Sequence, residues 1–228
     1  MSLLDFIFPK YCINCRKIGS YICDNCFSYI SFNEISTCVV CQKPALGGLT
    51  HPRCKKRSTI DGVISSLVYK GVVKKMVYQF KYKPHVSDLQ RTLDTLFYEG
   101  LIQKELFQTM VTGQVVLVPI PLHKKRFRSR GYNQSLLLAE GMSKLCGIEV
   151  LECIERVKNT TTQIRLSQEE RKENISGAFA VKNLWHPVRN VILIDDIVTS
   201  GATLAEAAKV LKKAGVEKVW GATLAHGK

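Results

Sequence analysis

Two adjacent carboxylates, Asp195 and Asp196, precede a short run of small and hydroxyl-bearing residues at positions 199–203. That run consists of Thr199, Ser200, Gly201, Ala202 and Thr203. Backbone N–H groups at the start of a helix bind anions, and a glycine lets the backbone approach them closely. The carboxylates would repel a bare phosphate, but they suit a ligand that also carries vicinal hydroxyls or a bound cation. A ribose 5-phosphate meets both requirements.

The elements on either side would place these residues at the edge of a sheet. Residues 191–194 are apolar without a break, which predicts a strand buried on both faces. Residues 204–214 carry apolar side chains at helical spacing. The structural alternative is a buried strand with an ordinary capped helix. We disfavour it because paired aspartates at the end of a buried strand are costly unless something binds them.

This order of strand, acidic pair and Thr/Ser/Gly loop closely resembles the phosphoribosyl-pyrophosphate (PRPP) motif of type I phosphoribosyltransferases. The resemblance implies that Asp195 and Asp196 are the catalytic pair and hold the ribose hydroxyls, directly or through Mg²⁺. It also implies that residues 199–203 wrap the 5-phosphate.

A second segment combines a buried strand at 115–118 with a proline-rich loop and a basic run. The run holds five cations in seven residues: Lys124, Lys125, Arg126, Arg128 and Arg130. Ligands of α/β sheets bind at the carboxyl ends of strands, so this loop and the Asp195 loop are predicted to face one pocket. The same resemblance implies that the loop binds pyrophosphate, through Pro121, Leu122, His123 and Arg130.

A polar stretch at 155–174 is long enough to form a lid over such a pocket. The alternative is a solvated surface helix in which Arg171 pairs with neighbouring glutamates. Residues 130–134, Arg-Gly-Tyr-Asn-Gln, resemble an element of a narrower group, the ComF family. Chains of that family place Arg, Gln, Arg and Asn in the lid, which implies these roles for Arg156, Gln163, Arg171 and Asn174.

The cysteines near the N-terminus form Cys-x-x-Cys pairs, which match the ComF family as well. The predicted ligands are Cys12, Cys15, Cys23 and Cys26 for one zinc, and Cys38, Cys41, Cys54 and His51 for a second. An interleaved pairing is the alternative, and His51 is the least certain ligand. The zinc would serve as a structural staple, although the cations at 53–57 would also suit a nucleic-acid or partner contact. A redox role for these thiols is disfavoured, since metal ligation explains their pairing better.

Composition sets wider limits. The net charge of +14 favours polyanionic partners, while a solvated basic surface explains it equally well. No apolar run has the roughly 18 residues that a membrane span needs. The start of the chain does not read as a signal peptide, so we expect a cytoplasmic protein whose cysteines bind metal.

We therefore predict an α/β protein: a zinc-binding module at 1–58, and a type I phosphoribosyltransferase-like domain at 59–228 with a mainly parallel sheet and flanking helices. It would bind PRPP and Mg²⁺ and transfer phosphoribosyl to an acceptor that the sequence does not mark. The ComF resemblance implies a role in DNA uptake during natural transformation, with single-stranded DNA and other uptake proteins such as a helicase as partners. The alternative is a non-catalytic nucleotide- or DNA-binding protein that keeps the PRPP fold.

Overall fold

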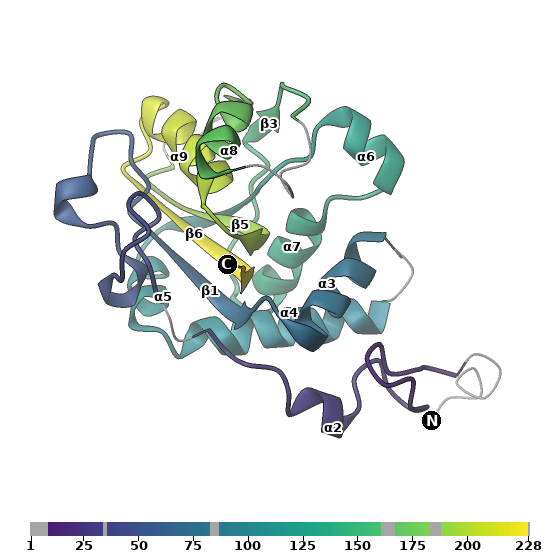
Figure 1. Cartoon of the computed structure of the whole chain (residues 1–228). Coiled ribbons are helices and arrows are strands. Elements are labelled where there is room, and N and C mark those ends of the chain that lie inside the picture. Colours follow the sequence, from purple (N-terminus) through teal and green to yellow (C-terminus); the bar gives the residue numbers. More distant parts are fainter. Residues whose placement is uncertain (1–8, 34–35, 83–86, 161–166, 183–187, 228) are drawn as a thin grey trace.

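The computed structural model describes residues 9–33, 36–82, 87–160, 167–182 and 188–227. Its centre is a parallel sheet with the strand order β1-β6-β5-β2 (Figure 1). The strands are β1 (Gly62–Val68), β2 (Val115–Pro119), β5 (Asn190–Val198) and β6 (Lys218–His226). The predicted class, α/β with a mainly parallel sheet, is confirmed.

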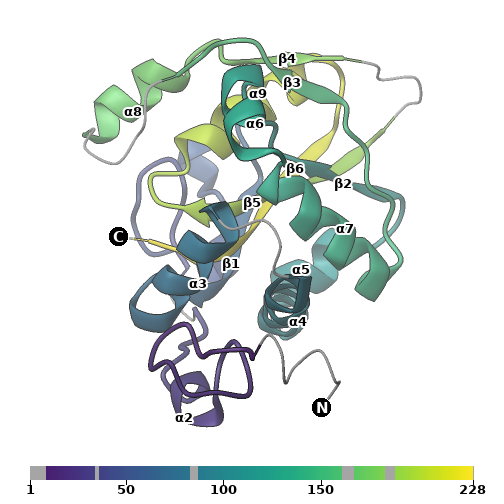
Figure 2. The same cartoon turned by 90° about the vertical axis from the view of Figure 1, so that its right-hand side faces the viewer.

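Helices cover both faces of this sheet, which explains the unbroken apolar run in β5. Ile192 and Ile194 join one buried cluster, whereas Val191 and Leu193 join the other. The first face is covered by α3 (Gly71–Tyr82), α4 (Ser87–Ile102), α5 (Glu105–Met110) and α7 (Gln134–Cys146). The second is covered by α9 (Ala202–Lys213) and by the hairpin of β3 (Ile154–Arg156) and β4 (Phe179–Val181) (Figure 2).

Two local expectations need correction. The apolar spacing over residues 87–110 predicts one long helix that Gly100 breaks or bends; instead Gly100 lies within α4, and the helices separate after Ile102. A Cβ at Gly100 would lie 2.6 Å from the Ser66 Cβ, so the glycine allows α4 to approach β1. The basic run after β2 is a short helix, α6 (Lys124–Arg130), where we expected a loop.

The N-terminal part forms two small ribbons. The first ribbon, residues 10–28, includes the single-turn helix α2 (Asp24–Phe27) and lies beneath α3 and α4 (Figures 1 and 2). The second ribbon, residues 37–55, contains two short 3-10 turns, Leu46–Gly48 and Pro52–Cys54. It runs beside the sheet, where Leu49 bridges to Gly62 of β1. Within the described residues, no helix is long and apolar enough to cross a membrane.

Candidate functional site

The two carboxylates lie inside β5, since its ladder with β6 continues as far as Val198. Asp195 accepts a hydrogen bond from Ser135 Oγ at 3.0 Å, and a second from the Asp196 N–H at 2.9 Å. Asp196 is buried, and its Oδ2 lies 2.7 Å from Lys81 Nζ of α3. Both carboxylates are therefore held in place by side chains of neighbouring helices.

The electrostatics of this pair match a site that receives a cation or a hydroxyl-rich ligand. Burial and the neighbouring Asp196 carboxylate raise the pKa of Asp195 to about 7. Burial by itself would lower the pKa of Lys81, but Asp196 raises it and the net shift is upward. Lys81 thus stays charged and neutralises one of the two acids. Such perturbed groups cluster at functional sites.

The predicted phosphate loop forms the turn between β5 and α9. Gly201 has a φ of 72° and is the N-cap residue of α9, a conformation that favours glycine. Thr199, Ser200, Ala202 and Thr203 complete the loop around it. The N–H groups of the first turn of α9 point out of the start of the helix and carry the positive end of its dipole. The start of α9 is therefore a suitable binding site for a phosphate group.

The loop that follows β2 lies directly beside the acidic pair. Pro119 is the register partner of Ile194, and the Ile120 N–H bonds the Ile194 carbonyl at 2.9 Å. Pro121, Leu122 and His123 continue from there, all half-buried. The ends of β2 and β5 therefore lie side by side at one edge of the sheet, as expected from the parallel order. His123 caps α6 by accepting the Lys125 N–H at 3.3 Å.

The Arg-Gly-Tyr-Asn-Gln element joins three parts of the domain. Asn133 donates to the Ile120 carbonyl at 3.1 Å and accepts the Ser135 N–H at 3.2 Å, which caps α7. Tyr132 donates its hydroxyl hydrogen to the Phe80 carbonyl of α3. Arg130 donates to Gln134 at 2.6 Å. The element thus fixes α7, and with it the Ser135 hydroxyl that binds Asp195.

The guanidinium groups of Arg156 and Arg126 lie near each other, and Arg156 also lies close enough to Asp195 to feel its charge. Burial and the nearby Arg126 lower the pKa of Arg156 to about 10, while Asp195 acts in the opposite direction. Burial and Arg130 also lower the pKa of Arg126. Arg156 Nε is buried and finds no hydrogen-bond partner within the described ranges. Mutually repelling, incompletely paired guanidiniums are the groups that an anion such as pyrophosphate would stabilise.

Three of the four expected lid residues lie in the described part of the chain, two of them on one helix and the third on a strand. Arg171 lies on α8 (Gln168–Ile175) and donates from Nη1 to Thr199 Oγ1 at 2.9 Å. Asn174 lies one turn further along the same helix. Arg156 is buried at the end of β3, and Gln163 lies outside the described residues. A helix does form here, as in the alternative interpretation of a solvated surface helix. Arg171 on this helix nevertheless contacts Thr199 of the phosphate loop.

The ribbons bring the predicted metal ligands together in two groups. One is formed by Cys12, Cys15, Cys23 and Cys26, the other by Cys38, Cys41, His51 and Cys54. Within each group all ligand atoms lie within 4.8 Å of one another, so the pairing is sequential and not interleaved. Thiolates bound to one tetrahedral zinc at about 2.3 Å are separated by comparable distances. Both groups therefore fit structural zinc.

His51 is oriented as a ligand of the second group. Its Nε2 lies 3.0 Å from the Pro44 carbonyl, which can only accept a hydrogen bond. The Nε2 atom must then carry the hydrogen, which leaves the Nδ1 lone pair facing Cys41 Sγ at 3.3 Å. A carbonyl that fixes the second nitrogen of a histidine in this way is common around zinc.

Comparisons with known proteins match the two ends of the chain to two different family models. Residues 3–55 match the model of the double zinc ribbon domain, and residues 155–228 match that of the phosphoribosyl transferase domain. "DNA utilization protein YhgH" of Salmonella typhimurium is 31% identical over 227 residues, covering 92% of this chain and 94% of that protein. "Competence protein F" of Haemophilus influenzae is 36% identical over 151 residues, covering 64% of this chain and 65% of that protein. "Competence protein ComFC" of Bacillus subtilis is 27% identical over 217 residues, covering 90% of this chain and 79% of that protein.

A parallel sheet carrying an acidic pair and a phosphate loop, preceded by two zinc ribbons, defines a phosphoribosyltransferase-type domain with an N-terminal double zinc ribbon. The chain belongs to the ComF family.

Several functional contacts were not assigned from the sequence. Lys81 belongs to a stretch, residues 72–82, whose helical spacing favours a surface position for it and leaves a substrate-facing one open; in the structure its side chain is held against Asp196. The sequence pattern marks Ser135 only as the start of a helix and gives Gln42 no role. Phe127 and Tyr132 lie among the cations and suit base stacking, with core packing as the alternative for Tyr132; Phe127 is exposed, whereas Tyr132 is tied to α3. The partners of Ser135 and Gln42 are 60 and 158 residues away in the chain, so local patterns could not reveal them.

Proposed function

We propose that the carboxyl ends of β2 and β5 bind PRPP together with Mg²⁺. The observation that carries this proposal is the convergence of three groups: the acidic pair, the glycine loop at the start of α9, and the buried guanidinium of Arg156. The loop would hold the 5-phosphate, and Asp195 and Asp196 the ribose hydroxyls. Arg156, Arg126 and the loop at 120–123 would face the pyrophosphate.

The reaction that this arrangement supports is displacement at ribose carbon 1. The bond from that carbon to the pyrophosphate oxygen breaks, and positive charge develops on the sugar. Asp195 and Asp196 would stabilise that charge, while the guanidinium groups would neutralise the leaving pyrophosphate. Bound Mg²⁺ supplies further neutralisation of the diphosphate. An acceptor nucleophile would form the new bond to carbon 1 as the pyrophosphate leaves.

Calorimetric titration with PRPP in the presence of Mg²⁺ tests the ligand assignment. We expect saturable binding that is lost in the double variant Asp195→Asn/Asp196→Asn. Absence of heat from the unaltered protein at about 1 mM ligand would overturn the assignment, since a Kd of that size corresponds to only about 4 kcal/mol. Pyrophosphate release with candidate acceptors then separates an enzyme from a protein that binds PRPP without turnover.

A second function, the handling of single-stranded DNA, is favoured by an exposed aromatic surface on α3. Tyr78 and Tyr82 are 65% and 57% exposed, and their ring centroids are 4.8 Å apart. The Arg130 guanidinium lies 5.5 Å from the Tyr82 ring centroid. Aromatic rings next to cations provide stacking for bases and charge for phosphates. The names of the relatives, which mention competence and DNA utilization, support a role in DNA uptake. We place this role in the cytoplasm, with other uptake proteins such as a helicase as partners.

Fluorescence anisotropy with labelled oligothymidine tests this surface. We expect Tyr78→Ala/Tyr82→Ala to weaken binding by about tenfold or more, because stacking contributes roughly 1–3 kcal/mol per base. Tyr29→Ala is a control, since Tyr29 on the linker after the first ribbon is also 65% exposed. Equal losses in both variants would place the DNA elsewhere. The Asp195→Asn/Asp196→Asn variant should still bind oligothymidine, so the two functions can be separated.

A further inference from the structure

The second ribbon touches the phosphate loop through two side chains, those of Gln42 and Val39. The Gln42 Nε2 group donates to the Ser200 carbonyl at 3.1 Å and to the Val39 carbonyl at 2.8 Å. These bonds use both hydrogens of the amide, so the orientation of the side chain is fixed. The contact joins a metal-binding turn to the loop that precedes α9.

The position of Gln42 follows from the shape of the metal-binding turn. Gln42 is the residue after Cys41 and adopts a φ of 59°, in the left-handed region. Its N–H bonds the Cys38 carbonyl at 2.8 Å, and the Cys38 N–H bonds the Lys43 carbonyl at 2.9 Å. A turn of this kind points both thiols toward one ion, so coordination holds the left-handed residue in place.

Val39 makes the same junction on its apolar side. It is buried in one cluster with Val198, which precedes the loop, and Ala202, which lies within it. A Cβ added at Gly201 would lie 1.9 Å from Val39 Cγ2. The missing side chain of Gly201 thus serves two purposes: it permits the backbone conformation of the loop, and it leaves room for the ribbon.

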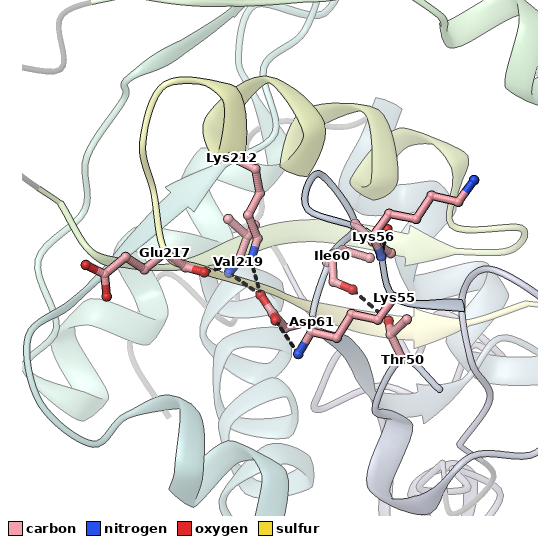
Figure 3. A network of polar contacts seen from close by, with 9 residues as sticks. Thr50, Lys55, Lys56, Ile60, Asp61, Lys212, Glu217 and Val219 are labelled. Atoms are coloured by element: carbon pink, nitrogen blue, oxygen red, sulfur yellow. Dashed lines mark hydrogen bonds and ion pairs between the residues drawn. The ribbon is translucent and has the colours of Figure 1, made fainter. Parts of the chain in front are cut away.

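The opposite end of α9 is anchored near the end of the same ribbon. Lys55, next to the ligand Cys54, lies 3.1 Å from Asp61 Oδ1, while Lys212 of α9 lies 2.6 Å from Asp61 Oδ2 (Figure 3). Asp61 also accepts the Val219 N–H of β6 at 2.9 Å. The second ribbon and its connection to β1 therefore contact the loop before α9 and the last turn of α9.

The first ribbon supplies an internal comparison. Arg16 follows Cys15, has a φ of 66°, and its N–H bonds the Cys12 carbonyl at 2.9 Å, just as Gln42 does in the second turn. This turn instead faces α3, where Asn14 accepts a hydrogen bond from Lys75 at 2.9 Å. In both views the first ribbon lies at the far end of the molecule from α9 (Figures 1 and 2).

We propose that the metal of the second ribbon positions the phosphate loop, with Gln42 and Val39 as the positioning residues. Occupancy of that metal site sets the order of residues 199–203 and hence their affinity for a phosphate-bearing ligand. The first metal site holds the first ribbon against α3 and leaves the loop unaffected. The effect on affinity rests on the proposed PRPP assignment, whereas the effect on loop order does not.

Hydrogen exchange of the full, zinc-loaded chain tests loop order directly. The variants are Gln42→Ala and Arg16→Ala, which alter the same position of the two turns and therefore carry similar backbone strain. We expect faster exchange of the amides at 199–204 in Gln42→Ala and unchanged exchange there in Arg16→Ala. Gln42→Met keeps the length of the side chain without its donors and should behave like Gln42→Ala. Unchanged exchange in both Gln42 variants, or equal changes in Gln42→Ala and Arg16→Ala, would overturn the proposal.

Metal removal and ligand binding form the second part of the test. Cys41→Ser should lose one zinc and weaken PRPP binding, whereas Cys15→Ser should lose one zinc and bind normally. Gln42→Ala should keep both metals and weaken binding about three- to tenfold, the range that a hydrogen bond of this kind provides. If Cys41→Ser does not fold, the Gln42 variants still decide the question. Lack of PRPP binding by the unaltered chain would refute the ligand assignment, and the exchange experiment alone would then decide loop positioning.

Discussion

Lys81 Nζ and Asp196 Oδ2 lie 2.7 Å apart, and this ion pair joins α3 to the centre of the predicted PRPP site. Asp195 is the preceding residue of β5, so the site combines two acids and one base. A divalent cation bound with PRPP would compete with the lysine for the same carboxylate. The pair thus links the stability of the protein to the chemistry of its site.

Replacing Lys81 by methionine should destabilise the protein at pH 8. Removing one partner of a buried pair costs on the order of 3 kcal/mol. For a chain of this size the loss corresponds to a fall of roughly 6–12 °C in the unfolding midpoint. The double variant Lys81→Met/Asp196→Asn should recover most of it, because Asp196 no longer carries a charge that lacks its lysine partner. Thermal scans of the three proteins make the comparison, and equal midpoints for the single and double variants would contradict it.

Replacing Arg171 by alanine should weaken PRPP binding about tenfold, because the Arg171–Thr199 hydrogen bond connects α8 to the phosphate loop. Lys172→Ala is the matched control: it removes the same charge from the same helix at an exposed position. Titration calorimetry with PRPP and Mg²⁺ measures both. A similar loss in the two variants would mean that net charge, and not the contact with Thr199, determines affinity.

Elemental analysis should find two zinc ions per chain, one for each group of ligands. Cys15→Ser and Cys41→Ser should each reduce the content to one. Cys146→Ser is the control, since Cys146 is half-buried at the end of α7 and belongs to neither group. A strong chelator should unfold both ribbons, whose stability depends on the metal. A content below one ion per chain in the unaltered protein would contradict the assignment.

Asp94 should make stability depend on pH. The residue lies on α4 against α7, where a Cβ at Gly141 would approach its Cγ to 2.2 Å. Burial raises the pKa of Asp94 to about 7, against the lowering effect of Lys144. The folded state therefore keeps a proton that the unfolded chain loses near pH 4, and stability falls as the pH rises from there toward 7. Above about pH 7 the folded state bears the full cost of burying a charged Asp94 carboxylate.

Asp94→Asn should remove this dependence. We expect the variant to be more stable than the unaltered protein at pH 8 and similar to it near pH 4–5, measured by urea unfolding. Asp24→Asn, the same change at an exposed position in the first ribbon, is the matched control. A stability difference that is constant across the pH range would argue against titration of Asp94.

The sequence predicted the features whose geometry is local. Cysteine spacing indicated both metal groups because each turn supplies two ligands within four residues. The apolar run at 191–194 predicted β5 because its two faces are both covered. The placement of Lys81, Ser135 and Gln42 could not be predicted in this way, since it depends on which helices and ribbons meet at the end of the sheet.

Gly100 and the basic run illustrate the same limit. A glycine in a helical pattern predicts a break, but here it is required for close packing of α4 on Ser66. The run at 124–130 was expected to continue the loop that the prolines after β2 begin, yet α6 forms between the His123 cap and Gly131, whose φ is 84°. Capping residues at both ends offset the repulsion within the helix.

One set of contacts joins residues that are far apart in the sequence, and this separation affects the order in which the chain folds. Gln42 with Ser200, Asp61 with Val219, and Ser65 with Thr223 are each separated by 158 residues. The second ribbon can take up its metal soon after it is synthesised, whereas β1 must wait for β6 before it joins the sheet. Contacts this distant close slowly. We therefore expect metal loading to come first during synthesis, so that zinc supply acts on the nascent chain well before a ligand site exists.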